Sequence, residues 1–405
     1  MTDVEGLLRA HAPRALGALV RRRGDFADAE DAMQEAMLAA SRDWPSQGVP
    51  DDPTAWLVRV GDRRLVDSWR SDSSRRRRED LYEVGQGEVA DTDDSLELLL
   101  LCCHPALTLP SQVALTLRAV GGLTTEQIAR GFLVPTATMA QRISRAKALI
   151  RAAGARFELP EPGALPGRVA AVATVVYLVF TEGHTASSGD SLVRIELADE
   201  AVRLGRLLLA RVRTEPALAD QEGEAAGLLA LMLLTQSRRP ARTDPTGRLV
   251  PLSEQDRSVW DRRLISEGVE LISAALATAP IGPYQLQAAI AAVHAEAPST
   301  DATDWRQILG LYDLLVAIAP SPMTRLNRVV ALAMADGPAA GLLALDTAAD
   351  DPTLTDNHRT HAVRAHLLEQ VGDTAAARSE YELAASLTQS IPERQHLYER
   401  AARCT

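Results

Sequence analysis

The sequence predicts an all-α protein, and two observations support this prediction. Hydrophobic residues make up 46% of the 405 residues but aromatic residues only 4%, and the strong helix formers alanine, leucine and arginine are abundant. Apolar residues also recur at helical spacing in segments that proline, glycine and polar residues separate. We therefore expect two small helical domains followed by a helical, tetratricopeptide-like C-terminal domain.

Charge is strongly segregated along the chain, although the formal net charge of −11 by itself argues against a nucleic-acid partner. Arg59–Arg78 contains eight arginines and three aspartates, and Arg118–Arg156 contains seven basic residues and one acidic residue. Between these blocks, Glu79–Glu97 contains eight acidic residues and no basic one. This alternation predicts two DNA-facing modules joined by a linker that stays off DNA.

Composition also predicts the domain boundaries. An acidic, glycine-containing segment predicts a linker at 81–95, and a segment with three prolines and two glycines predicts a second linker at 158–168. The chain is thereby divided into domains at 1–80, 96–157 and 169–405.

Apolar periodicity predicts a series of helices in the last domain, interrupted by a polar loop at Ser237–Asp256. Turns near Gly337 and Gly372 suggest a tetratricopeptide-like repeat in 283–390, with a generic helical bundle as the alternative. The residues that match the repeat are Ala365, Leu368, Gly372, Ala377, Tyr381 and Ala384. The expected helices are 167–182, 192–212, 222–237, 255–279, 283–296, 304–319, 323–335, 338–348, 358–370 and 373–389.

The second domain contains a helix-turn-helix pattern. Its first helix begins at Thr124, where Gln127 completes a capping box, and the turn lies at Gly131–Val134. A second helix follows at 135–153, and its outward face carries the polar and arginine side chains that reading the major groove requires. A solvated basic helix is the alternative. The expected buried stripe is Met139, Ile143, Ala146 and Ile150, and the expected outward face includes Thr138, Gln141, Arg142 and Arg145.

The first domain contains two helices of different character. The helix at 27–40 has an apolar stripe and an acidic outer side, which on composition alone serves solubility. The helix at 53–71 gathers arginines beside Trp56, an arrangement suited to stacking and neutralising unpaired bases. Trp69 is expected in the core, whereas Trp56 is expected either in the core or on the basic face. The apolar stripes are Ala29, Ala32, Met33, Ala36, Met37 and Ala40 in one helix and Val58, Leu65 and Trp69 in the other.

The order of these motifs resembles one family. The segment 28–35 (DAEDAMQE), then 55–59 (AWLVR), 64–70 (RLVDSWR), an acidic linker and 138–147 (TMAQRISRAK) are similar to regions 2 and 4 of extracytoplasmic-function sigma factors. Three further stretches, 176–184 (VYLVFTEGH), 239–244 (RPARTD) and 282–296 (GPYQLQAAIAAVHAE), resemble the subgroup with a tetratricopeptide-like C-terminal extension, as does 336–339 (DGPA).

The resemblance implies three surfaces. One binds core RNA polymerase and comprises Asp28, Asp31, Gln34 and Glu35. A second recognises and melts the minus-10 element of promoter DNA through the loop 45–53 and through Trp56, Arg59, Arg63, Arg64 and Arg70. A third reads the minus-35 element through Thr136, Thr138, Gln141, Arg142, Arg145 and Lys147. We also expect the acidic extension to contact the sigma core and to modulate its activity, in a required role.

The chain departs from the family pattern at three positions. Arg63 stands where many members have asparagine, Asp62 lies inside the basic face, and Pro135 replaces the usual serine cap. These departures bear on which promoter sequence is read.

Other readings of the sequence are weaker. A helix-turn-helix regulator that does not use core polymerase would not need the arginine and tryptophan helix of the first domain. An enzyme would need a site, yet Cys102, Cys103 and His104 lack a distant partner for a metal, and Glu182 and His184 lack a nearby nucleophile. We therefore expect no catalytic activity, cofactor or metal.

Cysteine content and apolar runs indicate the compartment. Three cysteines, two of them adjacent, do not form a disulfide framework, which favours a reducing compartment. The N-terminus lacks a signal-peptide pattern, and the longest apolar run, Val169–Thr181, is too short to span a bilayer. We therefore expect a cytoplasmic protein that does not enter the membrane.

Overall fold

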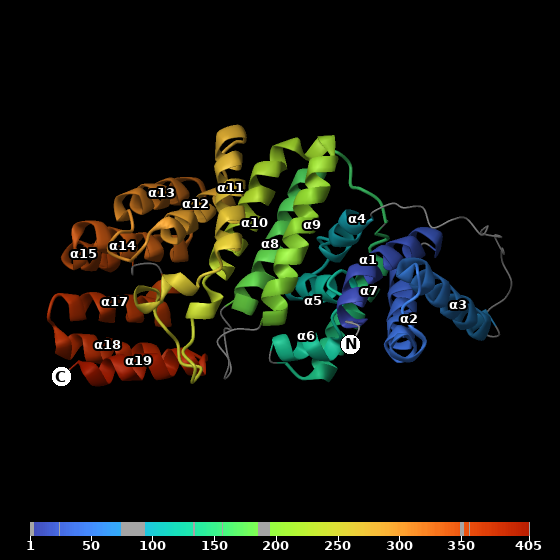
Figure 1. Cartoon of the computed structure of the whole chain (residues 1–405), viewed down its shortest axis with the longest axis horizontal. Helices are drawn as coiled ribbons and strands as arrows, with labels where there is room; N and C mark the ends of the chain where they lie inside the picture. The colour runs from blue at the N-terminus through green and yellow to red at the C-terminus, as the bar shows by residue number, and fades with distance from the viewer. Residues whose placement is uncertain are drawn as a thin grey trace. The chain divides into compact units, whose positions relative to one another are not determined.

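The computed structural model describes residues 4–23, 25–73, 94–132, 134–155, 157–184, 195–348, 352–355 and 357–404. Within these residues the prediction of an all-α protein is confirmed, and an isolated bridge between Thr243 and Leu249 is the one extended pairing. The chain divides into two compact units, whose helices Figure 1 labels. Unit 1 comprises Met1–Leu178 and Thr214–Leu218, and unit 2 comprises Val179–Arg213 and Ala219–Thr405.

Three mutually contacting helices form the N-terminal part of unit 1: α1 (Val4–Arg23), α2 (Phe26–Gln47) and α3 (Pro53–Ser73). The predicted apolar stripe of α2 is buried, except that Met37 is half-buried. Helix α2 is longer than predicted because it continues through Pro45 to Gln47 and ends at Gly48, whose φ of +89° favours glycine. The predicted loop at 45–53 is therefore shortened to 48–52.

The second part of unit 1 contains α4 (Ser95–Cys102), α5 (Leu109–Ala119), α6 (Thr125–Gly131) and α7 (Thr136–Ala152). The capping box is present, since the backbone N–H of Gln127 donates to Thr124 Oγ1 at 3.1 Å and the backbone N–H of Thr124 donates to Gln127 Oε1 at 2.8 Å. The leucine-rich α4 contacts both α1 and α5, so a buried helix joins the two parts of the unit. Four residues of α7 are buried as predicted: Met139, Ile143, Ala146 and Ile150.

Helix α8 (Leu165–His184) begins inside the predicted proline-rich linker, because proline is compatible with the first turn of a helix. Its Arg168 side chain donates a hydrogen bond to the carbonyl of Leu100 in α4. Among the described residues, α8 is the one helix long and apolar enough to cross a membrane by length and composition, and 44% of its apolar window is buried. The core helix of a soluble protein passes the same test.

Unit 2 is built around α10. Twelve of the 15 residues of α10 are buried, and this helix contacts α11 and α12. A Cβ atom at Gly227 would lie 2.6 Å from the backbone nitrogen of Gln285, so glycine permits the close approach of α10 to α12. The helices of this part are α9 (Ile195–Thr214), α10 (Glu222–Gln236), α11 (Arg262–Thr278) and α12 (Pro283–Glu296), with short 3₁₀ turns η2 (Arg239–Ala241), η3 (Leu252–Glu254) and η4 (Arg257–Val259). The 3₁₀ turn η1 (Pro216–Gln221) begins in the segment Thr214–Leu218 of unit 1 and ends in unit 2.

The rest of unit 2 is a succession of helices in which most helices contact the next one along the chain. Gly337 and Gly372 lie at helix–helix turns with φ of +98° and +88°, as the predicted repeat requires. Ala365, Ala377, Tyr381 and Ala384 form one buried cluster where α17, α18 and α19 lie side by side (Figure 1). The helices are α13 (Trp305–Ile318), α14 (Pro322–Asp336), α15 (Pro338–Ala348), α16 (Pro352–Thr355), α17 (His358–Gln370), α18 (Thr374–Leu387) and α19 (Ile391–Arg403).

Candidate functional site

The outward face of α7 is the candidate for reading DNA. Its side chains are exposed opposite the buried stripe, at the spacing that a helix inserted into a groove requires. Arg142 is half-buried, and Lys147 points away from this face toward α2. The exposed residues of the predicted minus-35 surface are Thr136, Thr138, Gln141 and Arg145.

The basic face of α3 carries the predicted minus-10 residues. Arg59, Arg63 and Arg64 are exposed, and the apolar stripe on the other side is buried at Val58 and Leu65. Trp56 is half-buried, with its ring 5.5 Å from the buried Trp44 ring at an interplanar angle of 67°. This edge-on contact fixes Trp56 at the border of the basic face. The side chains of Trp69 and Arg70 lie outside the described residues.

The acidic side of α2 carries the predicted polymerase-binding residues. Asp31 and Glu35 are exposed, whereas Asp28 and Gln34 are half-buried. Glu35 lies 3.3 Å from Arg64 of α3. The sequence prediction missed Glu30, which lies on the buried side of the same helix and is 1% exposed. The sequence did contain a signal for Glu30, because a carboxylate on the apolar side of a helix requires a partner.

Ion pairs join this acidic helix to the candidate DNA-reading helix. Lys147 Nζ lies 3.0 Å from Glu30 Oε2 and 2.5 Å from Asp31 Oδ1. Arg118 of α5 donates to the second Glu30 oxygen at 3.1 Å. The lysine and arginine side chains are 11% and 15% exposed, so solvent screens the pairs with Glu30 only weakly.

A second, more exposed contact lies one turn further along α7. Arg151 binds Asp25 in a fork, at 2.7 and 2.8 Å, and also donates to Asp28 at 2.7 Å. We call the two contacts together the α2–α7 latch: Asp25, Asp28, Glu30 and Asp31 on one side, and Arg118, Lys147 and Arg151 on the other.

The charges of the latch reinforce one another. Burial by itself would lower the pKa of Lys147, but Glu30 and Asp31 raise the pKa above its usual value. Burial acts to raise the pKa of Asp25, yet hydrogen bonds from Arg151 and from the backbone hold it below its usual value. The hydrogen bond with Asp25 also raises the pKa of Arg151. These three side chains are therefore charged at neutral pH.

Two of the four predicted polymerase-binding residues, Asp28 and Asp31, thus contact α7 within the same unit. Of the predicted minus-35 residues, Lys147 is turned into this contact. The structure therefore brings together residues that the sequence assigned to two separate surfaces. Asp25, Glu30, Arg118 and Arg151 complete the contact and were not predicted, because only the folded unit juxtaposes them.

Cys102 and Cys103 are buried, and so is His184, whereas Glu182 is half-buried. Burial raises the pKa of Cys103 to about 12 and holds the pKa of Cys102 far above its usual value. Burial, together with neighbouring arginines, lowers the pKa of His184 to about 2. No group of three potential metal ligands occurs among the described residues.

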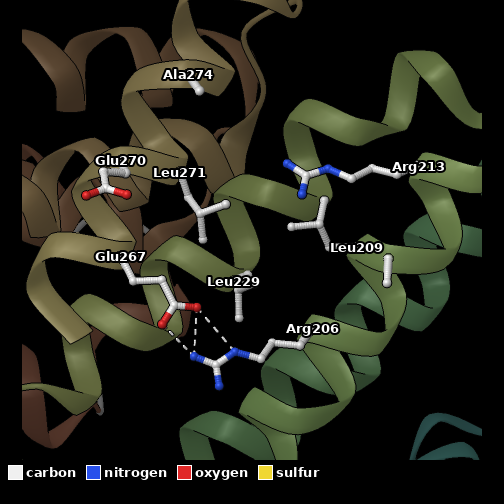
Figure 2. Close-up of a pocket in the computed structure, with 9 residues that line it drawn as sticks. Arg206, Leu209, Arg213, Leu229, Glu267, Glu270, Leu271 and Ala274 are labelled. Atoms are coloured by element: carbon white, nitrogen blue, oxygen red, sulfur yellow. Dashed lines mark hydrogen bonds and ion pairs between the residues drawn. The ribbon is translucent and has the colours of Figure 1, made fainter. Parts of the chain in front are cut away.

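A hollow of about 400 Å³ opens between α9, α10 and α11 of unit 2 (Figure 2). Leucines and alanines form much of its lining, and Arg206 crosses it to Glu267 at 2.6 Å. The lining contains two carboxylates, Glu267 and Glu270, and two arginines, Arg206 and Arg213, beside its apolar residues. The lining residues are Arg206, Leu209, Ala210, Arg213, Leu229, Glu267, Glu270, Leu271 and Ala274.

Comparison with known families matches three parts of the chain. Residues 7–75 match sigma-70 region 2, residues 97–150 match sigma-70 region 4, and residues 168–276 match a family of unknown function, DUF6596. The first match contains α2 and α3, and the second contains the helix-turn-helix. The third begins in α8 and ends in α11.

A similar full-length relative is an uncharacterized protein of Rhizobium meliloti (strain 1021), which is 42% identical over 408 residues, or 97% of this chain and 94% of that protein. The solved structure of yeast Tom70 shares 12% identity at a TM-score of 0.32, over 99% of this chain and 84% of that one, a likeness too low to bear on fold or function. The family matches and their order along the chain decide to which family the chain belongs. This chain belongs to the sigma-70 family, with regions 2 and 4 paired as in extracytoplasmic-function sigma factors and with a C-terminal extension.

Proposed function

We propose that this sigma factor directs core RNA polymerase to promoters through α2, α3 and α7. The observation that carries the proposal is that both sigma regions lie in one unit and that each presents an exposed basic face, on α3 and on α7. In this assignment the acidic side of α2 binds core polymerase. The basic face of α3 takes unpaired minus-10 bases, and the outward face of α7 reads minus-35 duplex. The factor would act in the cytoplasm.

Reconstituted transcription tests this assignment. The full chain is mixed with core polymerase and a library of promoter fragments, and initiated transcripts are sequenced. We expect transcription that depends on the chain and that starts downstream of two shared sequence elements. A helix-turn-helix regulator would instead bind duplex without polymerase and give no transcript, which would refute the assignment.

The latch suggests that the free factor rests in a closed form. Arg151 and Lys147 pair with Asp28 and Asp31, so core polymerase would compete with α7 for these two carboxylates. Binding of polymerase to α2 would therefore release α7 at the same time as it occupies the acidic side. We propose that opening of the latch precedes holoenzyme formation, and that the opened α7 then reaches the minus-35 element.

The extension is proposed to be required for activity. Residues 157–405 contain 22 basic and 32 acidic residues, and this acidic domain is tethered to two basic surfaces at high effective concentration. The proposed contact between the extension and the sigma core supports the active arrangement of the two regions. A passive domain or a masking domain is the alternative.

Two truncations separate these outcomes. One ends after Phe157 and removes α8, and the other ends after His184 and keeps α8 together with the Arg168 contact to α4. If the extension is required, both lose transcription with purified polymerase. Loss with the shorter chain alone would limit the requirement to α8. A gain with both would mean masking, and full activity with both would refute any role.

A further inference from the structure

Three stretches of the extension that the sigma function does not use come together in unit 2. They are the end of α8 at His184, the loop that begins at Arg238, and the end of α12 at His294. Arg242 donates a hydrogen bond to the carbonyl of His184. Arg257 donates from Nη1 to the carbonyls of His294 and Ala297, both at 2.7 Å. Each of these arginines therefore holds the C-terminal end of a helix, where a cation is favourable.

These contacts do not satisfy every hydrogen-bond donor of Arg257 among the described residues. Arg257 is 8% exposed, and its Nη2 is buried without a hydrogen-bond partner among the described residues. The guanidinium carbon lies 4.9 Å from the centre of the Trp260 ring, which excludes water from one side. An unpaired guanidinium nitrogen in such a position is unfavourable, because the desolvated charge is not compensated.

Arg238 is a second cation that has no acceptor partner among the described residues. No ion pair or hydrogen bond of its side chain occurs among the described residues. Burial and the neighbouring Arg257 lower its pKa to about 10. The pKa of Arg242 falls to about 10 for similar reasons, although Glu393 opposes the change. We call Arg238, Arg242 and Arg257 the arginine cluster; their segments are brought together where η2 contacts η4 and where the backbone N–H of Asp261 donates to the carbonyl of Ser237 at 2.9 Å.

The two histidines beside the cluster remain neutral. Burial and neighbouring arginines lower the pKa of His184 to about 2 and that of His294 to about 4. His184 stacks on Phe180 with the ring centres 5.5 Å apart, and the Nδ1 atom of His294 is buried with no hydrogen-bond partner among the residues that the structure describes. Neutral imidazoles add no further repulsion and supply hydrogen-bonding nitrogens.

We propose that the arginine cluster binds a small anion that carries a phosphate group. Guanidinium groups match phosphate oxygens in a fork, and a phosphate near neutral pH brings close to two negative charges to three cations. Among the described residues, the Nη2 atom of Arg257 and the guanidinium of Arg238 have no hydrogen-bond partner, and these two groups are the proposed donors. The site lies within the part of the chain that matches the family of unknown function, and it does not involve the DNA-facing helices.

Titration of the full chain tests the proposal, with inorganic phosphate and pyrophosphate as probes and chloride at matched ionic strength as the reference. We expect saturable heat on titration calorimetry and a rise in the thermal midpoint that chloride does not produce. Arg238→Gln is expected to weaken binding by about tenfold or more, because one charged hydrogen bond is lost. The side chain of Arg238 makes no hydrogen bond or ion pair among the described residues. This variant is therefore expected to fold and, without phosphate, to be at least as stable as the parent.

Two controls keep the result interpretable. Arg263→Gln removes an exposed arginine of α11 outside the cluster and should bind phosphate like the parent chain. Arg257→Lys keeps a charge but loses the fork, and should bind weakly even if it remains folded. The proposal is overturned if neither probe differs from chloride, or if Arg238→Gln binds phosphate as tightly as the parent. Neither result depends on transcription, so both are independent of the sigma assignment.

Discussion

Glu30 has the most demanding environment of the acidic residues in α2. Its carboxylate accepts hydrogen bonds from Gln34, Arg118 and Lys147, and its side chain is 2% exposed. A buried carboxylate with three donors replaces the water that it lost on folding. Removal of the carboxylate leaves Arg118 buried without a counter-charge and leaves Lys147 with Asp31 as its one carboxylate partner among the described residues.

We predict that Glu30→Ala lowers the free energy of unfolding of unit 1 by about 3–5 kcal/mol, because Arg118 loses its carboxylate partner while Lys147 keeps only the exposed Asp31. Urea unfolding followed by circular dichroism measures this change. Glu35→Ala is the matched control, since Glu35 is exposed and its one ion pair within the described part of the chain is with Arg64 at 3.3 Å. Its expected effect is about 0–1 kcal/mol. Equal losses in the two variants would contradict the proposed role of Glu30.

Arg142 tests the reading of DNA by α7. In the holoenzyme, Arg142→Ala should cost about 1–3 kcal/mol at one minus-35 base pair and little at the others. Binding to promoters with each base pair substituted in turn measures this difference. Arg130→Ala, on the exposed side of α6, should show no such preference. A uniform loss on all sequences would make Arg142 a phosphate contact, with a salt slope of about 0.9 per contact.

At the scale of single residues, the sequence predicted which face of α7 is exposed and which is buried. It failed where a side chain's partner is distant in the chain. Lys147 follows Arg142 and Arg145 in helical order and was assigned to DNA with them, but it contacts residues more than 100 positions away. Periodicity within a helix carries no information about such a partner.

At the scale of elements, α7 has two roles that use different faces. Its outward face is exposed, and its C-terminal half contacts α2 through Lys147 and Arg151. The contact near Arg151 is solvent-accessible, since that side chain is 55% exposed, and it should weaken as salt rises. The contact near Glu30 should resist salt.

We predict that Arg151→Asp shifts the free chain toward an open form, because three attractive hydrogen bonds become repulsion with Asp25 and Asp28. Fluorescence energy transfer between labels on α2 and α7 measures the opening. Adding Asp28→Arg should restore the closed distance by exchanging the charges. Arg145→Asp on the outward face is the control and should leave the distance unchanged. If Arg151→Asp also leaves it unchanged, the latch does not hold the closed form.

The C-terminal ends of α8 and α12 carry the neutral histidines His184 and His294. Arg242, Arg238 and Arg239 act on the first, and Arg238 and Arg257 act on the second. Their folded pKa values of about 2 and 4 lie below the usual value of 6.5. The unfolded chain therefore binds more protons below pH 6.5, so unit 2 loses stability as the pH falls from there.

We predict that the free energy of unfolding of unit 2 falls by roughly 1.4 kcal/mol per histidine for each pH unit between about pH 6 and 4.5. Urea unfolding at several pH values, followed by tryptophan fluorescence, measures the slope. His294→Gln should remove one histidine's share of the slope. A slope that this variant does not change would contradict the buried, neutral state of His294.

Most element boundaries were predictable, and the exceptions have physical causes. Helix α11 was predicted from residue 255 but begins at Arg262, because Asp261 accepts hydrogen bonds from the backbone of Arg263 and Leu264. The earlier Asp256 caps only the short turn η4. Helix α19 was missed because its buried side consists of only three residues, a stripe too thin for periodicity to reveal.

At the scale of the whole molecule, assembly with polymerase tests the acidic side of α2. We predict that Asp31→Arg together with Glu35→Arg abolishes co-purification with core polymerase while helicity is retained. Glu35→Arg alone tests the polymerase contact without disturbing the latch, since Glu35 pairs with Arg64 of α3. Asp31→Arg alone also removes a partner of Lys147. Unchanged co-purification of the double variant would remove α2 from the polymerase surface.

The sequence predicted the order of regions across the whole chain, because each region has its own charge and periodicity. It could not predict that the two sigma regions form one compact unit, since the pairs that join them are far apart in the chain. Nor did it reveal the arginine cluster: Arg238 and Arg242 come from a loop predicted only as polar, and Arg257 comes from a segment predicted as the start of a helix.

If core polymerase binds the acidic side of α2 as proposed, α7 competes with it for the same residues from within the molecule. The apparent affinity for polymerase then equals the intrinsic affinity multiplied by the fraction of molecules that are open. Dilution lowers the concentration of every external competitor, but it leaves an intramolecular one unchanged. The number of open molecules would therefore rise in proportion to the amount of the factor that a cell makes. A larger amount would not relieve the inhibition by α7, because each molecule carries its own α7. The equilibrium between closed and open latch, which limits the use of these promoters, is thus a property of each molecule at any concentration.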